Sequence, residues 1–541
     1  MSPALSQVVA SGLLARLAAS GVTDFLIAPG SRSQALAIAA GQLERAGLAR
    51  VIVRLDERSL GFTALGLAAA TQRVVAVITT SGSAVANLHP AVLEGHHAGM
   101  PLLLLTADRP HELRGVGANQ TTNQVGIFAD AVRHCFDIPA AASLNEAEEI
   151  VAIADRALAI ATGRSGDRPG PVQLNLSFRE PLSATEPDAA AEFQALRGRL
   201  NSELARVANA QPATDTHELL AETPGCVIAG SNAGFEAAKF AQAAGWPLFA
   251  EPNSGARTGP NLVPRYADIL RVGLSNGTGD AAGNLVDRIR QVVIFGRPTL
   301  NRVVSELLAR EEIAITVVRD LLQGTFDPTR RAERFTDAVS PAGMADPAWL
   351  AGWIEASSGS PSTNFDSARQ DLVREVFSAS RADGRALLLG ASDLIRQADR
   401  WAPDCAGLQV FANRGISGID GTIATAQGIA LSGQFSGVRV LLGDLTFLHD
   451  LASLNQTELP QLNLQLVVGN DFGGRIFQKL RVADSLPEQD FQRLFLTPQN
   501  LELRALAVAF GWAYVGAETP QHLAAALRES GPQIIEYRLP T

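Results

Sequence analysis

Short apolar runs alternate with amphipathic stretches along the first 180 or so residues. Apolar runs of this length bounded by Gly, Pro or Asp are typical of buried strands, and apolar residues three or four apart are typical of helices. The pattern predicts helices at 3–20, 33–46, 57–71 and after Ser83, and strands at 24–30, 50–55, 73–80, 101–108 and 171–177. Such regular alternation indicates a doubly wound α/β domain with a parallel sheet.

The same alternation returns twice further along the chain. A polar, Ala-rich stretch at 183–215 predicts a linker with some helix, and a Pro/Ser/Gly-rich segment at 325–365 predicts the next boundary. The strands expected after these boundaries are 226–230, 292–296, 313–318, 386–390, 408–415, 438–444, 462–471 and 532–539, and the helices are 419–432, 448–454 and 501–510. We therefore predict three doubly wound parallel-sheet domains, at 1–182, 183–355 and 356–541. The first and third domains show a similar alternation of predicted strands and helices, which is compatible with duplication.

Composition narrows the functional classes. The chain has 541 residues, of which 46% are hydrophobic and 18% are charged, a balance typical of packed globular proteins and not of disordered ones. A formal net charge of -10 argues against a general nucleic-acid binder, because such binding needs a basic surface. We expect any anionic ligand to be held by a local pocket.

The lysines, the cysteines and the length of the apolar runs exclude further kinds of function. Lys239 and Lys479 are the only lysines, and neither follows a glycine, which disfavours Schiff-base and P-loop mechanisms. Cys135, Cys226 and Cys405 are far apart, so no zinc spacing or disulfide framework is indicated. With no signal-type N-terminal segment and no apolar run of about 18 residues, we expect a cytoplasmic protein without a membrane segment.

Two acidic residues follow neighbouring predicted strands of the third domain. Asp444 lies in Gly443-Asp444-Leu445, and Asp471 follows 27 positions later, so both carboxylates are expected at one edge of the sheet. Together with a backbone carbonyl of the turn at Gly473, they suit a Mg²⁺ ion that also binds a diphosphate. Glycines in both turns let backbone N–H groups approach phosphate oxygens. Alternatively, Asp444 only caps a helix and Asp471 only begins a turn.

This pair of acids resembles the thiamine-diphosphate motif of 2-oxoacid decarboxylases and carboligases. The resemblance extends over the whole chain and implies pyrimidine-binding, central and diphosphate-binding domains in that order, with thiamine diphosphate and Mg²⁺ or Mn²⁺ as cofactors. It also implies that Glu57 hydrogen-bonds the aminopyrimidine from a dry pocket. Asp56 competes for this role, and we favour Glu57 because of its position before the helix that begins RSLGF. The alternative is a surface carboxylate that offsets the helix dipole.

Four longer strings narrow the resemblance. The segments 28–39, 106–128, 390–396 and 413–421 are similar to those of the 2-succinyl-5-enolpyruvyl-6-hydroxy-3-cyclohexene-1-carboxylate synthases of menaquinone biosynthesis, the MenD family. This resemblance implies decarboxylation of 2-oxoglutarate and a Stetter-like 1,4-addition of the succinyl unit to isochorismate. It further implies a homodimer or a dimer of dimers. Another thiamine-diphosphate carboligase and a non-catalytic diphosphate-binding protein remain as alternatives.

The resemblance also implies a set of site residues. Both substrates carry two carboxylates, which arginine forks bind bidentately. The substrate-facing residues would be Ser31, Arg32, Arg109, Gln120, Arg302, Ser392, Arg396 and Arg414, and five of these, Arg32, Arg109, Gln120, Arg396 and Arg414, would act in catalysis beside Glu57. The cofactor would contact Glu57, Ser392, Ile419, Gly443, Asp444, Leu445, Gly474, Ile476 and Phe477, and the metal Asp444, Asp471 and Gly473. Arg302 stands where the family often has lysine, and Asp471 where many thiamine enzymes have asparagine.

Overall fold

The computed structural model describes residues 4–183, 188–208, 215–276, 281–320, 322–359, 366–456, 459 and 461–540. The chain divides into two compact units. Unit 1 comprises residues 1–209, 415–434 and 450–462, and unit 2 comprises residues 210–414, 435–449 and 463–541. Both units therefore contain segments that are far apart in the sequence.

Unit 1 contains one six-stranded parallel sheet in the order β2-β1-β3-β4-β6-β5. Its strands are β1 (Asp24–Ile27), β2 (Arg50–Val53), β3 (Val75–Thr79), β4 (Leu102–Asp108), β5 (His134–Ile138) and β6 (Val172–Ser177). The central strands β3, β4 and β6 are buried along their whole length, which explains the apolar runs of β3 and β4. In β6, the buried polar residues Gln173 and Asn175 form hydrogen bonds to side chains of β4. The sequence pattern predicted every strand except β5, an edge strand that is only partly buried.

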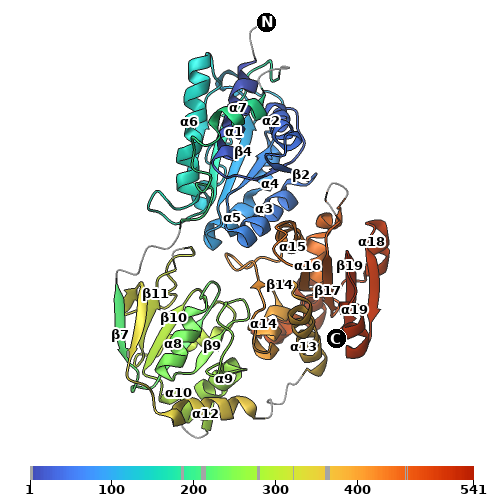
Figure 1. Ribbon diagram of the computed structural model, residues 1–541. Coiled ribbons are helices and arrows are strands. Elements are labelled where there is room, and N and C mark those ends of the chain that lie inside the picture. The colour runs from blue at the N-terminus through green and yellow to red at the C-terminus, as the bar shows by residue number, and fades with distance from the viewer. Residues whose placement is uncertain are drawn as a thin grey trace. The chain divides into compact units, whose positions relative to one another are not determined.

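Eight helices surround this sheet in the described part of unit 1, and Figure 1 shows α6 and α2 on either side of α1, against which both pack. They are α1 (Leu5–Ala19), α2 (Gln34–Arg45), α3 (Glu57–Thr71), α4 (Ser83–Asn87), α5 (His89–Ala98), α6 (Leu144–Ala161), α7 (Ala189–Leu196) and α15 (Thr422–Leu431). Helix α7 is the helix expected within the linker at 183–215. Helix α6, which was not predicted, begins with a capping box in which Ser143 accepts from the Glu146 N–H and Glu146 accepts from the Ala142 N–H.

Helices α3 and α15 cross at backbone contact, although they are far apart in the sequence. A Cβ atom at Gly66 would lie 2.0 Å from the Thr425 carbonyl oxygen, and one at Gly428 would lie 2.0 Å from the Thr63 carbonyl oxygen. No side chain fits at either position, so glycine on both helices is what permits the crossing. Both helices are buried along most of their length as a result.

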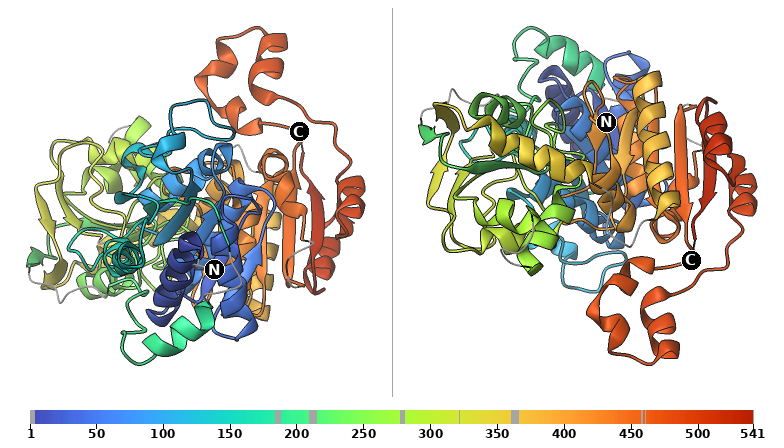
Figure 2. Two further views of the ribbon diagram at one scale, coloured as in Figure 1. Left: turned by 90° about the horizontal axis from the view of Figure 1, so that it is seen from above. Right: turned by 90° about the horizontal axis from the view of Figure 1, so that it is seen from below.

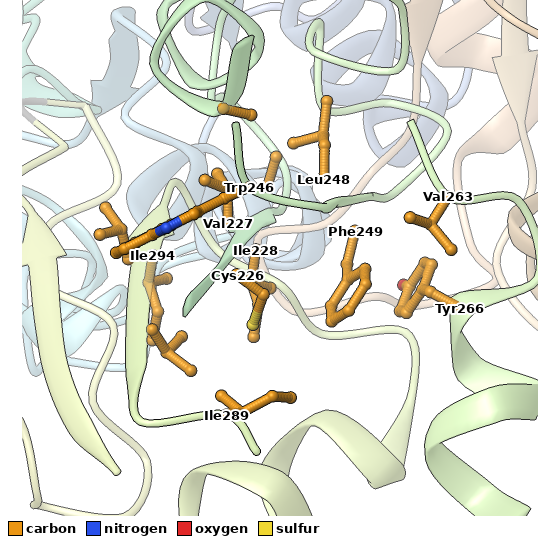
Figure 3. Packing of buried hydrophobic residues seen from close by; sticks show 14 of the residues in the cluster. Cys226, Val227, Ile228, Trp246, Leu248, Phe249, Val263, Tyr266, Ile289 and Ile294 are labelled. Carbon is orange, nitrogen blue, oxygen red and sulfur yellow. The ribbon is translucent and has the colours of Figure 1, made fainter. Parts of the chain in front are cut away.

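Unit 2 contains a central parallel sheet in the order β12-β11-β10-β8-β9. Its strands are β8 (Gly225–Ala229), β9 (Leu248–Ala250), β10 (Gln291–Phe295), β11 (Ala314–Val318) and β12 (Arg334–Thr336). The flanking helices are α8 (Glu236–Ala244), α9 (Tyr266–Asn276), α10 (Ala281–Asp287), α11 (Arg302–Leu308) and α12 (Pro347–Ser358). Figure 3 shows the core of this sheet, where Phe249 stacks on Tyr266 with ring centroids 5.2 Å apart.

A separate pair of parallel strands, β7 (Thr216–Leu220) and β13 (Ala338–Ala342), joins segments on either side of the central sheet. The predicted boundary segment 325–365 therefore carries regular structure, namely β12, β13 and α12. Its proline, serine and glycine content had indicated a domain boundary. The strands are short and the helix begins with Pro347 at its first position, where a missing N–H is harmless.

The last sheet, also in unit 2, has the parallel order β15-β14-β16-β17-β19-β18. Its strands are β14 (Ala386–Leu389), β15 (Val410–Phe411), β16 (Val438–Gly443), β17 (Leu464–Asn470), β18 (Ala513–Ala517) and β19 (Gln533–Arg538). Its helices within unit 2 are α13 (Ser367–Asp383), α14 (Asp393–Trp401), α16 (Asp444–His449), α17 (Glu488–Phe491), α18 (Leu503–Ala509) and α19 (Pro520–Leu527). Figure 2 shows short helical turns between β17 and α18 that project away from this sheet.

The prediction of three doubly wound parallel sheets is confirmed. Every strand pair within the three larger sheets is parallel, and the first and last sheets have the same strand order when their strands are numbered along the chain. Each larger sheet lies within one of the three predicted domain ranges, while the boundaries at 182 and 355 stay predictions. In the described part of the chain, no helix is long and apolar enough to cross a membrane.

Candidate active site

The strand order of the last sheet reverses between β14 and β16, and the carboxyl ends of strands at such a point form a natural ligand crevice. Ser392 follows β14, Asp444 follows β16, and Asp471 follows the next strand, β17. The sequence prediction that both acids emerge at one edge is therefore consistent with the register, in which Gly443 is paired with Gly469.

Asp444 is a buried carboxylate with one free oxygen. Asp444 is the first residue of α16, and its side chain accepts hydrogen bonds from the backbone N–H groups of Leu445 and Gly473. Its Oδ2 atom is buried and has no hydrogen-bond partner. Burial, together with the charge of Asp471, raises the pKa of Asp444 to about 6. A buried oxygen in this state is well suited to accept a cation.

Asp471 is also buried and is held by an arginine that the sequence analysis did not identify. Arg369, on α13, forms an ion pair with Asp471 and contacts Asp366 and Asp393 as well. Burial raises the pKa of Asp471, and the charge of Arg369 partly offsets this effect. Arg369 precedes Asp471 by 102 positions, so no local spacing could have indicated the contact.

The turn after Asp471 requires glycine. Gly473 has φ 138°, and a Cβ atom there would lie 2.4 Å from the Leu496 carbonyl oxygen. A Cβ atom at Gly474 would lie 2.7 Å from the Phe495 carbonyl oxygen. By contrast, a Cβ atom at Gly443 would meet no other atom within 4 Å, which leaves open space beside the backbone before Asp444. This space fits the close approach of a phosphate group.

The donor set fits a small, hard cation. Two carboxylates and a backbone carbonyl of the Gly473 turn are oxygen ligands, which Mg²⁺ and Mn²⁺ prefer. Among the described residues, no group of three or more His, Cys, Asp or Glu side chains gathers as a metal cluster.

Ser392 and Arg396 lie together at the start of α14. Ser392 has φ 103°, an unfavourable conformation for serine, and such strain is concentrated at functional sites. The exposed Arg396 donates to the Ser392 carbonyl oxygen at 2.6 Å. Phe477 packs against Phe495 with ring centroids 5.6 Å apart, and Ile476 and Leu445 are half-buried beside the same two turns.

Two predicted substrate arginines of unit 2 differ in their surroundings. Arg414 is buried and donates to the Thr299 hydroxyl at 2.5 Å, so its guanidinium is engaged by the central sheet. The Arg302 side chain is 91% exposed and pairs with Glu306, one turn further along α11. The structure does not bring Arg302 together with the other predicted site residues of unit 2.

Two predicted substrate residues of unit 1, Arg109 and Gln120, meet around Ser81, which follows β3 at the reversal point of the first sheet. Arg109 donates to the Ser81 hydroxyl and to the Gln120 carbonyl oxygen, and Gln120 donates to the Ser81 carbonyl oxygen at 3.0 Å. Burial and the nearby charge of Arg32 lower the pKa of Arg109. Ser81 was not predicted, although Ser81-Gly82-Ser83 begins two residues after the end of the buried strand β3.

Arg32 and Ser31 complete this edge of the first sheet. Arg32 is buried and donates to the Phe178 carbonyl oxygen at 3.0 Å, while its Nε atom has no partner. Ser31 is exposed at the start of the same turn, and no contact joins it to Arg109. The charge of Arg32 acts on Arg109, and two arginines this close are well suited to receive a carboxylate.

Glu57 is the first residue of α3, and its neighbour Asp56 is the N-cap. Asp56 accepts from the Arg58 N–H at 2.9 Å, so this carboxylate is occupied by the helix end. Glu57 is half-buried in the single chain, and its carboxylate accepts a long hydrogen bond of 3.3 Å from the Asn87 side chain. This division supports Glu57 over Asp56 as the reactive carboxylate, while the dry pocket expected around Glu57 is not formed within unit 1.

The loop that carries Ile419 is anchored by a buried carboxylate that was not predicted. Glu94 on α5 accepts the backbone N–H groups of Gly415 at 2.6 Å and Ile416 at 2.8 Å. A Cβ atom at Gly415 would lie 2.6 Å from the Glu94 carbonyl oxygen, so the loop passes α5 at backbone contact. Ile419 is half-buried just before α15.

Comparison with known proteins decides the family. Residues 7–127 match the thiamine pyrophosphate enzyme N-terminal TPP-binding domain. Two curated 2-succinyl-5-enolpyruvyl-6-hydroxy-3-cyclohexene-1-carboxylate synthases, from Leifsonia xyli subsp. xyli and Clavibacter michiganensis subsp. michiganensis, are each 41% identical over 98% of this chain, covering 96% and 95% of those proteins. A third, from Saccharopolyspora erythraea, is 35% identical over 99% of this chain and 96% of that protein. The chain belongs to this synthase family.

Membership in the synthase family confirms the resemblance drawn from the sequence strings. The matched segment 7–127 contains Arg32, Glu57, Arg109 and Gln120 of unit 1. The likeness to the synthases extends across the segments of unit 2 that hold Asp444 and Asp471. The individual roles of these residues are not tested by the comparisons and are treated as proposals below.

Proposed function

We propose that this chain catalyses the thiamine-diphosphate-dependent decarboxylation of 2-oxoglutarate and the 1,4-addition of the succinyl unit to isochorismate. The product is 2-succinyl-5-enolpyruvyl-6-hydroxy-3-cyclohexene-1-carboxylate, an intermediate of menaquinone biosynthesis. The observation that carries the proposal is the identity of 41% over 98% of the chain to synthases of this name. The arginine cluster in unit 1 and the paired acids in unit 2 support it.

Asp444, Asp471 and the Gly473 carbonyl are proposed to hold Mg²⁺ or Mn²⁺, which in turn binds the cofactor diphosphate. The free Oδ2 atom of Asp444 supports this role, and cation binding would offset the burial of both carboxylates. The open backbone at Gly443, with Leu445 and Gly474, would receive phosphate oxygens. Arg369 already neutralises one carboxylate, so we expect it to shift when the cation binds.

When bound, thiamine diphosphate supplies a nucleophilic ring carbon that attacks a 2-oxo acid and stores the electrons released with carbon dioxide. Glu57 is proposed to share a proton with the aminopyrimidine, and Ile419, Ile476 and Phe477 to form apolar walls around the cofactor, with Ser392 beside them. A carboxylate performs such proton sharing best when water is excluded. Since Glu57 is half-buried within unit 1, we propose that a second subunit completes its pocket in a homodimer or a dimer of dimers.

Arginines are proposed to bind the substrate carboxylates. Arg32 and Arg109, with Ser31 and Gln120, would receive one substrate from unit 1, and Arg396 and Arg414 would contribute from unit 2. Arginine retains its charge at all relevant pH values, so these sites favour dianionic substrates over pyruvate. We propose a cytoplasmic location, in keeping with three free cysteines.

An assay of the purified protein with thiamine diphosphate and Mg²⁺ tests the proposal. We expect turnover with 2-oxoglutarate plus isochorismate and little with pyruvate alone. Turnover only with pyruvate would instead indicate another thiamine-diphosphate carboligase. Glu57→Gln should abolish carboligation while Mg²⁺-dependent cofactor binding, measured by calorimetry, persists. If Glu57→Gln leaves activity intact or the wild type has none, the catalytic assignment is wrong.

A further inference from the structure

Asp450 is a fully buried carboxylate that lies six residues after Asp444, in unit 1. It belongs to neither of the helices that it contacts. Its Oδ2 atom accepts the Ala424 N–H at 2.9 Å, and the Ile423 N–H also faces the carboxylate. These N–H groups belong to the first turn of α15, which has no side-chain cap of its own because its N-cap is Gly421. Asp450 therefore caps α15 from a distant segment.

The other oxygen of Asp450 leads to α3 through two serines. Ser453 donates to Asp450 Oδ1 at 2.7 Å, and the Ser453 and Ser59 hydroxyl oxygens are 2.8 Å apart. A serine has one hydroxyl proton, so if Ser453 gives its proton to Asp450, Ser59 must be the donor between the two hydroxyls. All three side chains are buried. A single chain of hydrogen bonds thus joins the starts of α15 and α3.

Charged and polar neighbours reinforce this arrangement. Arg54, buried at the end of β2, lies close to both Asp450 and Asp56, whose charges raise its pKa, while burial lowers that pKa to about 10. The Gln427 side chain donates to the Ser453 carbonyl oxygen at 2.6 Å, which ties α15 to the same segment a second time. The backbone contacts of Gly66 and Gly428 hold the two helices together one and two turns further along.

The starts of these two helices carry proposed cofactor-contacting residues. Glu57 is the first residue of α3, and Ile419 lies three positions before the first residue of α15. We propose that Asp450 is a positioning residue that fixes Glu57 and Ile419 by tying together the first turns of α3 and α15. The inference rests on the proposed function for what Glu57 and Ile419 do, whereas the clamp itself rests only on the contacts above.

Asparagine and alanine at position 450 should act differently. In Asp450→Asn, the amide oxygen can accept from Ala424 while the amide nitrogen donates to Ser453, with both serines reversing so that Ser59 donates to Asp56, whose Oδ2 lies 3.3 Å away. Asp450→Ala leaves the buried N–H groups without a partner. The asparagine variant should therefore rescue whatever the alanine variant loses.

Hydrogen exchange measured by mass spectrometry on the full-length protein tests the clamp without any turnover. Asp450→Ala should speed exchange at the first turns of both α15 and α3, and Asp450→Asn should restore protection, while β16 and β17 stay unchanged. The matched control is Asp346→Ala, which removes the exposed N-cap of α12 and should loosen only that helix. Faster exchange at α15 alone, or no rescue by asparagine, would overturn the proposal.

Kinetics then separate positioning from general damage. We expect Asp450→Ala to lower kcat about tenfold or more, because even a small displacement of a reacting group slows the reaction strongly. The KM for 2-oxoglutarate and the Mg²⁺-dependent cofactor affinity should change less than about threefold. Asp450→Asn should recover most of kcat. Equal losses in kcat and cofactor affinity would refute positioning. Absence of wild-type turnover would refute the proposed function, and the exchange result would still decide the clamp.

Discussion

Glu251→Gln should make the protein more stable at neutral and alkaline pH. Glu251 follows β9 in the central sheet and is 1% exposed. Its Oε1 atom accepts the Leu300 N–H at 2.7 Å, whereas Oε2 has no partner. Burial and the nearby charge of Asp399 raise the pKa of Glu251 from 4.5 to about 8. Glutamine keeps the bond to Leu300 and removes the ionisable group.

The expected gain in stability follows from the linkage between proton binding by Glu251 and folding. A carboxyl whose pKa is raised on folding contributes its full stability below pH 4.5 and loses it as the pH rises through about 8. At 1.36 kcal/mol per pKa unit, this loss is about 3 kcal/mol at pH 7. If all 541 residues unfold in one transition, this corresponds to a difference in Tm of about 3 °C between wild type and variant.

Thermal unfolding followed by circular dichroism at pH 5, 7 and 8.5 measures the effect. The advantage of Glu251→Gln over wild type should grow from pH 5 to pH 8.5. Glu311→Gln, which changes an exposed glutamate in the same unit, is the matched control and should track the wild type at each pH. An advantage that is absent, or that shrinks as the pH rises, would refute the reasoning from burial.

Three further substitutions test the site and the helix crossing. Asp444→Asn should weaken Mg²⁺-dependent binding of thiamine diphosphate by roughly 100-fold or more in calorimetry, and unchanged affinity would exclude Asp444 as a ligand. Gly66→Ala should lower stability by roughly 2–3 kcal/mol, because its Cβ would lie 2.0 Å from the Thr425 carbonyl oxygen, whereas Gly41→Ala, near only a flexible arginine, should not. Because the Arg302 side chain is 91% exposed, Arg302→Ala should leave kcat/KM within about twofold of the wild-type value. A larger loss would indicate that Arg302 does bind substrate.

The central strands of the fold could be predicted because they are buried along their length. β4 begins with four consecutive leucines and β17 contains the apolar run 466–468, and burial of both faces of a parallel sheet favours such runs. β5 and β18 were missed because both are edge strands with exposed and half-buried positions, which leaves no clear period. α6 was missed although its capping box and apolar face were visible in the sequence.

The site was predictable where it depends on strand ends and unpredictable where it depends on distant contacts. Asp444 directly follows the end of β16, so its position could be inferred from the sequence alone. Arg369 and Glu94 reach the site region from helices far away in the sequence, and no spacing rule links them to Asp471 or Gly415. The Arg302 side chain is 91% exposed, and its role in substrate binding stays a prediction.

The crossing of α3 and α15 has a consequence for biosynthesis. The N-terminal sheet leaves the ribosome first, but the helix that covers α3 begins at Thr422, more than 350 residues later. Until that segment emerges, the nascent chain must expose an apolar, glycine-rich helix face, a state that is prone to aggregation. We therefore expect the growing polypeptide to depend on chaperones through most of its translation, and a truncated product ending near residue 209 to be insoluble.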